Sequence, residues 1–213
     1  RRQKLAKNLA DFQTEPIETR VKDVRRVMAR FFGTPDEPRL PELEGVDLTG
    51  VLDLELVQIA AGSGDDSPPD HPTGLFRRLC VQCHGISGNG NGPLARQLNP
   101  YPRDYRRGIF KFKRTPTTLP PTTADLHNVL VRGVPGTAMP SFRLLDELQR
   151  EALVQYVRYL AIRGSFERAI IEEAAFELND DELLLDPELE EGRYTQLQQL
   201  DILNEIAASV IQP

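Results

Sequence analysis

The 213-residue sequence contains no tryptophan, only two cysteines, two methionines and three histidines. Its cysteines are Cys80 and Cys83, and a disulfide across two residues would be a tight, reactive ring rather than a staple for a chain of this size. The chain has no run of eighteen apolar residues, which excludes a membrane-spanning helix. With 39% hydrophobic residues, it can still bury a sizeable core in one domain or two.

Both cysteines belong to one motif, Cys-Val-Gln-Cys-His at residues 80–84. Two thiols at this spacing can add to the two vinyl groups of a protoporphyrin, and the adjacent His84 can then bind the iron. A thioredoxin-like pair would need a preceding strand in a βαβ context, which the sequence does not show. Structural zinc needs four ligands, and His71 and His127 lack the spacing of a zinc finger. The motif therefore predicts covalent haem c, one per chain.

A glycine-rich loop at residues 85–92 follows the motif. Glycines there would let the backbone pass close to a flat macrocycle, where side chains would clash. A proline carbonyl at the end of this loop could accept the second N–H of His84 and so fix its tautomer.

One of the two methionines is a candidate iron ligand. Met139 lies between prolines and glycines at residues 133–142, on an expected loop from which its thioether could reach iron. Met28 instead lies within a helical apolar stripe, where methionine usually packs in a core. We therefore assign Met139 to the site and Met28 to the core.

Aromatic and cationic residues alternate over residues 100–115, a mixture that also occurs in nucleic-acid-binding proteins. Next to a haem, the same residues fit a cofactor pocket better, and we expect no nucleic acid as a partner. Arg103 or Arg114 is expected to meet a propionate. Three aromatic side chains are expected to wall the macrocycle: Tyr101, Phe110 and Phe112.

Residues 74–163 resemble a class I cytochrome c. The resemblance rests on the motif at residues 80–84, the run that continues to Pro93, the segment 133–142 and two flanking helices. Phe76 matches the aromatic of the family's first helix, and the residues it packs against on the last helix correspond to Leu153 and Tyr156. The resemblance implies that His84 and Met139 are the axial ligands, that the Pro93 carbonyl supports His84, and that the protein carries single electrons.

The expected fold is therefore all-α, a cytochrome c core with additional helices at both ends. We divide the chain into a helical extension and linker at residues 1–70, a haem domain at 71–163 and an acidic helical extension at 164–213. An amphipathic helix that ends at Phe32-Gly33 is expected to dock on the haem domain, and the last helix of that domain is expected to end at Gly164-Ser165. The other expected helices lie near residues 51–61, 73–83, 123–133, 146–162, 166–178 and 187–210.

The net charge of −6 conceals a strong segregation. Residues 74–163 carry 14 lysines and arginines against 5 aspartates and glutamates, a net +9, whereas residues 164–213 carry 2 against 13, a net −11. Cations around an exposed haem edge could steer an acidic redox partner. In a rival interpretation, the acidic segment folds back on the basic surface and neutralises it.

The expected function is single-electron transfer between redox partner proteins in a respiratory chain, with no catalytic residues. Two alternatives stay open: a haem subunit of a larger membrane oxidoreductase complex, and a five-coordinate haem enzyme or gas sensor without Met139 on the iron. The outer helices could also form a homodimer interface. The chain begins at Arg1, and we expect a removed signal peptide or an N-terminal anchor. Since the family attaches haem c outside the cytoplasm, we expect a periplasmic or other extracytoplasmic, membrane-associated location.

Overall fold

A computed structural model describes residues 14–41, 48–62, 74–116 and 120–176, together with residues 183, 184, 201, 204 and 205. These residues contain helices and one isolated bridge between Gly33 and Pro38, and no strand occurs among them. The expected all-α fold is confirmed for this part of the chain. No helix within it has both the length and the apolar character that crossing a membrane requires.

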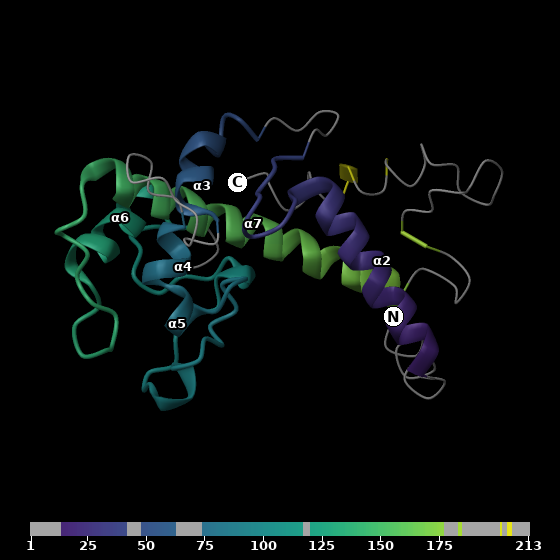
Figure 1. Ribbon diagram of the computed structural model, residues 1–213, viewed down its shortest axis with the longest axis horizontal. Coiled ribbons are helices and arrows are strands. Elements are labelled where there is room, and N and C mark those ends of the chain that lie inside the picture. Colours follow the sequence, from purple (N-terminus) through teal and green to yellow (C-terminus); the bar gives the residue numbers. More distant parts are fainter. Residues whose placement is uncertain are drawn as a thin grey trace.

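The two longest helices, α2 (Thr14–Phe32) and α7 (Glu147–Phe176), pack against each other, as Figure 1 shows. Phe31 and Phe32 of α2 meet the ring of Phe166, with ring centroids 5.9 and 5.2 Å apart. Tyr159 donates a hydrogen bond from its hydroxyl to the Phe32 carbonyl. The predicted stripe of α2 is therefore the packed face, although Val21 at its start is 40% exposed.

α7 runs straight through the position at which the sequence suggested a helix end, so the expected break at Gly164-Ser165 is wrong. A Cβ at Gly164 would lie 2.3 Å from the Cβ and 2.4 Å from the Cα of Arg106, in the 3-10 helix η2 (Tyr105–Arg107). Glycine is needed here because η2 lies against the helix, and not because the helix stops. The expected helices at 166–178 and 146–162 are thus one element as far as Phe176, and the expected helix at 187–210 falls largely outside the described residues.

Three short helices lead into the haem-attachment motif. α3 (Leu54–Ala60) confirms the short helix expected within residues 51–61, and the Asp53 carboxylate caps it by accepting a hydrogen bond from the Leu56 N–H at 3.2 Å. α4 (Leu75–Leu79) and α5 (Val81–His84) replace the single helix expected at 73–83. They are separated because Cys80, with φ −119°, leaves the helical range.

α6 (Thr123–Arg132) begins with a capping box, in which Thr122 and Asp125 each accept a hydrogen bond from the other's backbone N–H at 3.1 Å. The helix ends at Gly133, as expected. Figure 1 shows α3, α4 and α6 grouped around the first half of α7, with α2 beside the second half. Phe76 packs on Tyr156 with ring centroids 4.9 Å apart, which confirms the expected contact between the first and last helices of the haem domain.

Candidate functional site

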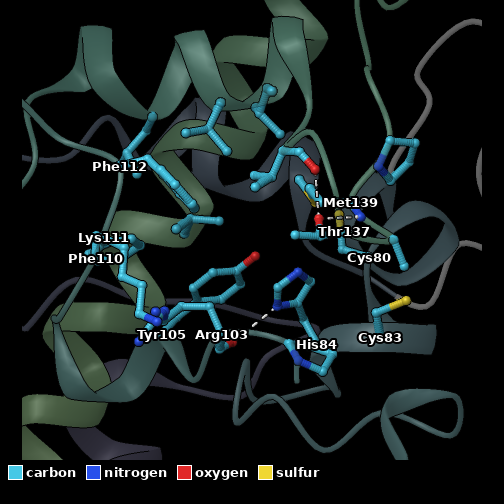
Figure 2. Close-up of a pocket in the computed structure, with 18 of the residues that line it drawn as sticks. Cys80, Cys83, His84, Arg103, Tyr105, Phe110, Lys111, Phe112, Thr137 and Met139 are labelled. Carbon is cyan, nitrogen blue, oxygen red and sulfur yellow. Dashed lines mark hydrogen bonds between the residues drawn. The ribbon is translucent and has the colours of Figure 1, made fainter. Parts of the chain in front are cut away.

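One cavity of about 240 Å³ brings together most of the residues that the sequence singled out (Figure 2). Its walls come from α4, α5, α6 and α7 and from two connecting segments, residues 98–112 and 134–142. The lining is mainly apolar, with contributions from Leu98, Leu126, Val129, Leu130, Val154 and Val157. Such a lining suits a large flat cofactor with a small number of polar attachment points.

His84 is held in a single protonation state. Its side chain is 8% exposed, and Nδ1 lies 3.0 Å from the carbonyl oxygen of Arg103. A carbonyl oxygen only accepts, so Nδ1 carries the proton and Nε2 keeps its lone pair. Burial lowers the pKa of His84, and the hydrogen bond to Arg103 only partly opposes this shift. His84 is thus a neutral imidazole with a nitrogen free to bind a metal.

The carbonyl that fixes this tautomer belongs to Arg103, and so it takes the role that the resemblance gave to Pro93. Pro93 is exposed and is absent from the described lining of the cavity. The physical reason is the path of residues 102–105, which lie against the glycine-rich loop: the Tyr105 N–H donates to the Gly88 carbonyl at 2.7 Å. A Cβ at Gly90 would lie 2.6 Å from the Pro102 carbonyl oxygen.

The glycines of residues 85–92 are not among the residues that line the cavity, and the expected close approach of this loop to the macrocycle stays a prediction. A Cβ at Gly92 would lie 2.4 Å from the carbonyl oxygens of Val81 and Gln82. These glycines let the loop fold back onto α5 and receive residues 102–105. They therefore support His84 from outside the cavity.

Cys80 and Cys83 both line the cavity and form no disulfide. Burial, with Cys83 nearby, raises the pKa of the Cys80 thiol to about 12. A redox-active cysteine pair needs a lowered thiol pKa, so these surroundings disfavour the thioredoxin-like alternative. Within the described ranges, no three His, Cys, Asp or Glu side chains gather as a metal-binding cluster of their own. Two unbonded thiols beside a neutral imidazole fit a haem attached through thioethers.

Met139 lines the same cavity as His84, and Figure 2 shows it above His84 in that view. Its loop is fixed by local hydrogen bonds: the Met139 N–H donates to Thr137 Oγ1 at 3.1 Å, and this hydroxyl donates to the Val134 carbonyl at 2.8 Å. Met28 is 1% exposed within the core, as expected. Of the two thioethers, Met139 is therefore the one available to a cofactor in the cavity.

The three aromatic residues expected around the macrocycle all line the cavity: Tyr101, Phe110 and Phe112. Arg103 also lines it. Their contacts with a macrocycle and a propionate stay predictions. Arg114 is not in the lining. Its backbone N–H donates to Asp125 Oδ2 at 3.3 Å and its guanidinium lies 3.9 Å from Oδ1, so it is held at the start of α6. His127 is half-buried on α6 outside the lining, and His71 lies outside the described residues.

Sequence reasoning missed Tyr105. Its ring stacks on the His84 imidazole, with centroids 4.5 Å apart and planes at 19°, and the side chain is 8% exposed. Burial raises the pKa of Tyr105 well above its ordinary value, so the phenol stays protonated. The only signal in the sequence was an aromatic among the cations of residues 100–115, and nothing in the spacing separated Tyr105 from Tyr101.

Comparison with known proteins gives two matches. Residues 67–157 match the family model of cytochrome c oxidase, cbb3-type, subunit III. A chain of the reducing HAO-like protein complex of Kuenenia stuttgartiensis is 34% identical, over 40% of this chain and 39% of that chain, with a TM-score of 0.39. The match thus spans well under half of that relative. No curated protein matches the chain.

Proposed function

Because residues 67–157 form a class I-like c-type cytochrome domain with covalently bound haem c, we propose that the protein carries single electrons between redox partners in a respiratory chain. The observation that carries this proposal is the convergence on one cavity of an imidazole with a free Nε2, a thioether and two unbonded thiols. The haem supplies a one-electron ferric–ferrous couple when it is bound.

In this proposal, His84 and Met139 are the two axial ligands. With both positions filled by protein, no substrate or gas molecule reaches the iron, which favours a carrier over a five-coordinate enzyme or sensor. The soft thioether of Met139 in an apolar cavity favours the ferrous state and raises the potential. Cys80 and Cys83 attach the macrocycle through its former vinyl groups.

The rim of the cavity is the proposed docking surface for an acidic redox partner. Two of the side chains that line it are large, apolar and more than half exposed: Tyr101 (54%) and Phe112 (60%). Ile109, 50% exposed, lies in the same segment of the chain. Exposed cations Arg107 and Lys111 lie in the same segment. Apolar side chains near cations can provide buried contact area for a partner and also steer an acidic partner electrostatically. Association with such a partner should therefore weaken as the salt concentration rises.

We further propose a periplasmic or other extracytoplasmic location, since class I cytochromes receive haem c outside the cytoplasm. The alternative, a haem subunit of a larger membrane oxidoreductase complex, draws support from the oxidase subunit for which the matching family model is named. Gel filtration of purified protein and pull-down from a membrane extract separate a free carrier from a subunit.

The axial ligands are tested by substitution of the two methionines. Oxidised wild-type protein should show the intact mass of one added haem and the charge-transfer band of methionine bound to ferric iron. Met139→Leu should abolish this band and lower the potential, because a soft ligand is lost. Met28→Leu, a volume-conserving change in the core, should leave both unchanged. A wild-type spectrum that is high-spin and takes up cyanide at once would refute the carrier.

A further inference from the structure

We propose that Tyr105 is a positioning residue that fixes the plane of the axial imidazole, and through it the electronic structure of the iron. The inference rests on the proposed role of His84 as an iron ligand. Figure 2 shows the Tyr105 ring beside the His84 ring in the cavity.

The hydrogen bond to Arg103 alone does not fix the ring plane. It holds Nδ1 at 3.0 Å from one carbonyl oxygen, but an imidazole can still tilt about that single contact. Tyr105 supplies the second restraint, because its ring lies 4.5 Å away and within 19° of parallel. Both restraints come from one short segment, two residues apart, so they act on His84 as a unit.

Tyr105 is itself firmly held, which a positioning residue requires. Its N–H donates to the Gly88 carbonyl at 2.7 Å, and a Cβ at Gly88 would lie 3.0 Å from Tyr105 Cδ2. Phe76 meets the Tyr105 ring edge-on with centroids 6.4 Å apart, and Phe110 lies parallel to it at 6.0 Å. A ring confined on these sides cannot move away when the imidazole moves.

The proposal requires the ring of Tyr105 but not its hydroxyl. Substitutions can therefore distinguish stacking of the ring from a polar role of the hydroxyl. If stacking fixes the imidazole, then Tyr105→Phe keeps the restraint and Tyr105→Leu removes it. Phe31→Leu is the matched control, because it removes a buried aromatic ring that meets Phe166 of α7 and does not line the cavity.

The experiment records electron paramagnetic resonance spectra of the ferric holoproteins and the paramagnetic NMR shifts of the haem methyl groups. Both depend on the orientation of the axial imidazole plane, which a general loss of stability does not alter. We expect Tyr105→Phe and Phe31→Leu to keep the wild-type spectra. Tyr105→Leu should shift the largest g value by more than its line width and change the spread of the methyl shifts.

Wild-type spectra in Tyr105→Leu would overturn the proposal, as would equal shifts in Tyr105→Phe or Phe31→Leu. If Tyr105→Leu fails to bind haem, Tyr105→Met replaces it, since methionine fills a buried apolar site without supplying a ring. A shifted g value then supports the proposal, and an unshifted one overturns it. Intact mass and the methionine charge-transfer band of each variant report separately on the proposed function.

Discussion

At Gly164, the absence of one Cβ decides how two elements meet. The backbone and side chain of Arg106 occupy the space that any larger residue would need on this face of α7. η2 then lies against the helix, and its first residue, Tyr105, reaches His84. A residue without a side chain thus contributes to the geometry of the site.

Gly164→Ala should destabilise the protein although alanine is the better helix former. The gain in helix propensity is about 1 kcal/mol, whereas overpacking against Arg106 costs about 1–3 kcal/mol. Because the clash involves the Arg106 backbone, relaxation is limited and we expect a net loss in the free energy of unfolding in guanidinium. Gly50→Ala is the control, since a Cβ there meets nothing within 4 Å. A stabilised Gly164→Ala would show that η2 does not press on α7.

At the scale of elements, α6 depends on the charge at its N-terminus. Asp125 is 4% exposed and accepts backbone hydrogen bonds from Thr122 and Arg114. Burial by itself would raise the pKa of Asp125, but the hydrogen bonds from Thr122 and Arg114 outweigh it and hold the pKa below its ordinary value. The carboxylate therefore stabilises the folded state in its charged form.

The lowered pKa of Asp125 makes the stability of the folded protein depend on pH. A lowered folded pKa contributes stability that is present above the unfolded value of about 3.9 and is lost as the pH falls through the folded value. Asp125→Asn should thus lower the urea midpoint at pH 7, and the difference from wild type should shrink below about pH 4. Thr122→Ala, which removes the other half of the capping box, should cost about 1 kcal/mol at pH 7. A difference for Asp125→Asn that does not vary with pH would refute the charged cap.

At the scale of the whole molecule, α2 and the haem-binding helices share one hydrophobic core built on α7. Phe32 and Phe166 are fully buried at its α2 end, and Phe76 and Tyr156 lie near the cavity. Arg77 of α4 also forms an ion pair with Asp36, just after α2, at 2.5 Å. We therefore expect these parts to unfold together.

Phe32→Ala tests this cooperativity. It should lower the free energy of unfolding by about 3–5 kcal/mol, because a large side chain leaves a cavity between α2 and α7. Transitions followed by far-ultraviolet circular dichroism and by the methionine charge-transfer band should shift together. Val21→Ala, near the start of the same helix, where the side chain is 40% exposed, should change stability by less than about 0.5 kcal/mol. An unshifted haem transition in Phe32→Ala would identify two independent units.

The net positive charge of residues 74–163 should affect how fast the whole protein reacts with a charged redox partner. The double variant Lys111→Glu/Lys113→Glu should slow oxidation of the reduced protein by ferricyanide about tenfold at low ionic strength, because it reverses local attraction of an anion. The effect should fade above about 0.1 M salt, where the Debye length is about 10 Å. Lys22→Glu/Arg25→Glu makes the same change in net charge on exposed positions of α2 and should have a smaller effect. Equal slowing in both would assign the effect to net charge alone.

The contact of Leu184 shows where part of the acidic C-terminal segment lies beyond α7. Leu184 is buried, and its N–H donates to the Asp23 carboxylate of α2 at 2.6 Å. At this point the chain lies on α2, and Figure 1 shows α2 beside the half of α7 away from the haem-binding helices. Whether acidic residues reach the basic rim of the cavity stays a prediction, since most of them lie outside the described residues.

The features that depend on neighbours along the chain could be predicted from the amino-acid sequence. The spacing of Cys80 and Cys83 and the adjacent His84 specified the haem, because covalent attachment needs those groups within one turn. The stripe of α2 and the capping residues of α6 predicted their helices, because apolar periodicity and caps are local properties. Met139 was separated from Met28 by the same local contrast between a loop and a helical stripe.

Contacts between residues that are distant in the sequence could not be predicted in this way. The partner of His84 is the carbonyl of Arg103, nineteen residues away, and every residue offers a carbonyl, so no side-chain pattern could distinguish it from Pro93. Gly164 looked like a helix end because glycine weakens helices, but the packed backbone of Arg106 outweighs that local preference. The contacts of Tyr105 with His84 and of Arg114 with Asp125 likewise join separate segments of the chain. Such contacts depend on how the segments pack, which local propensities do not encode.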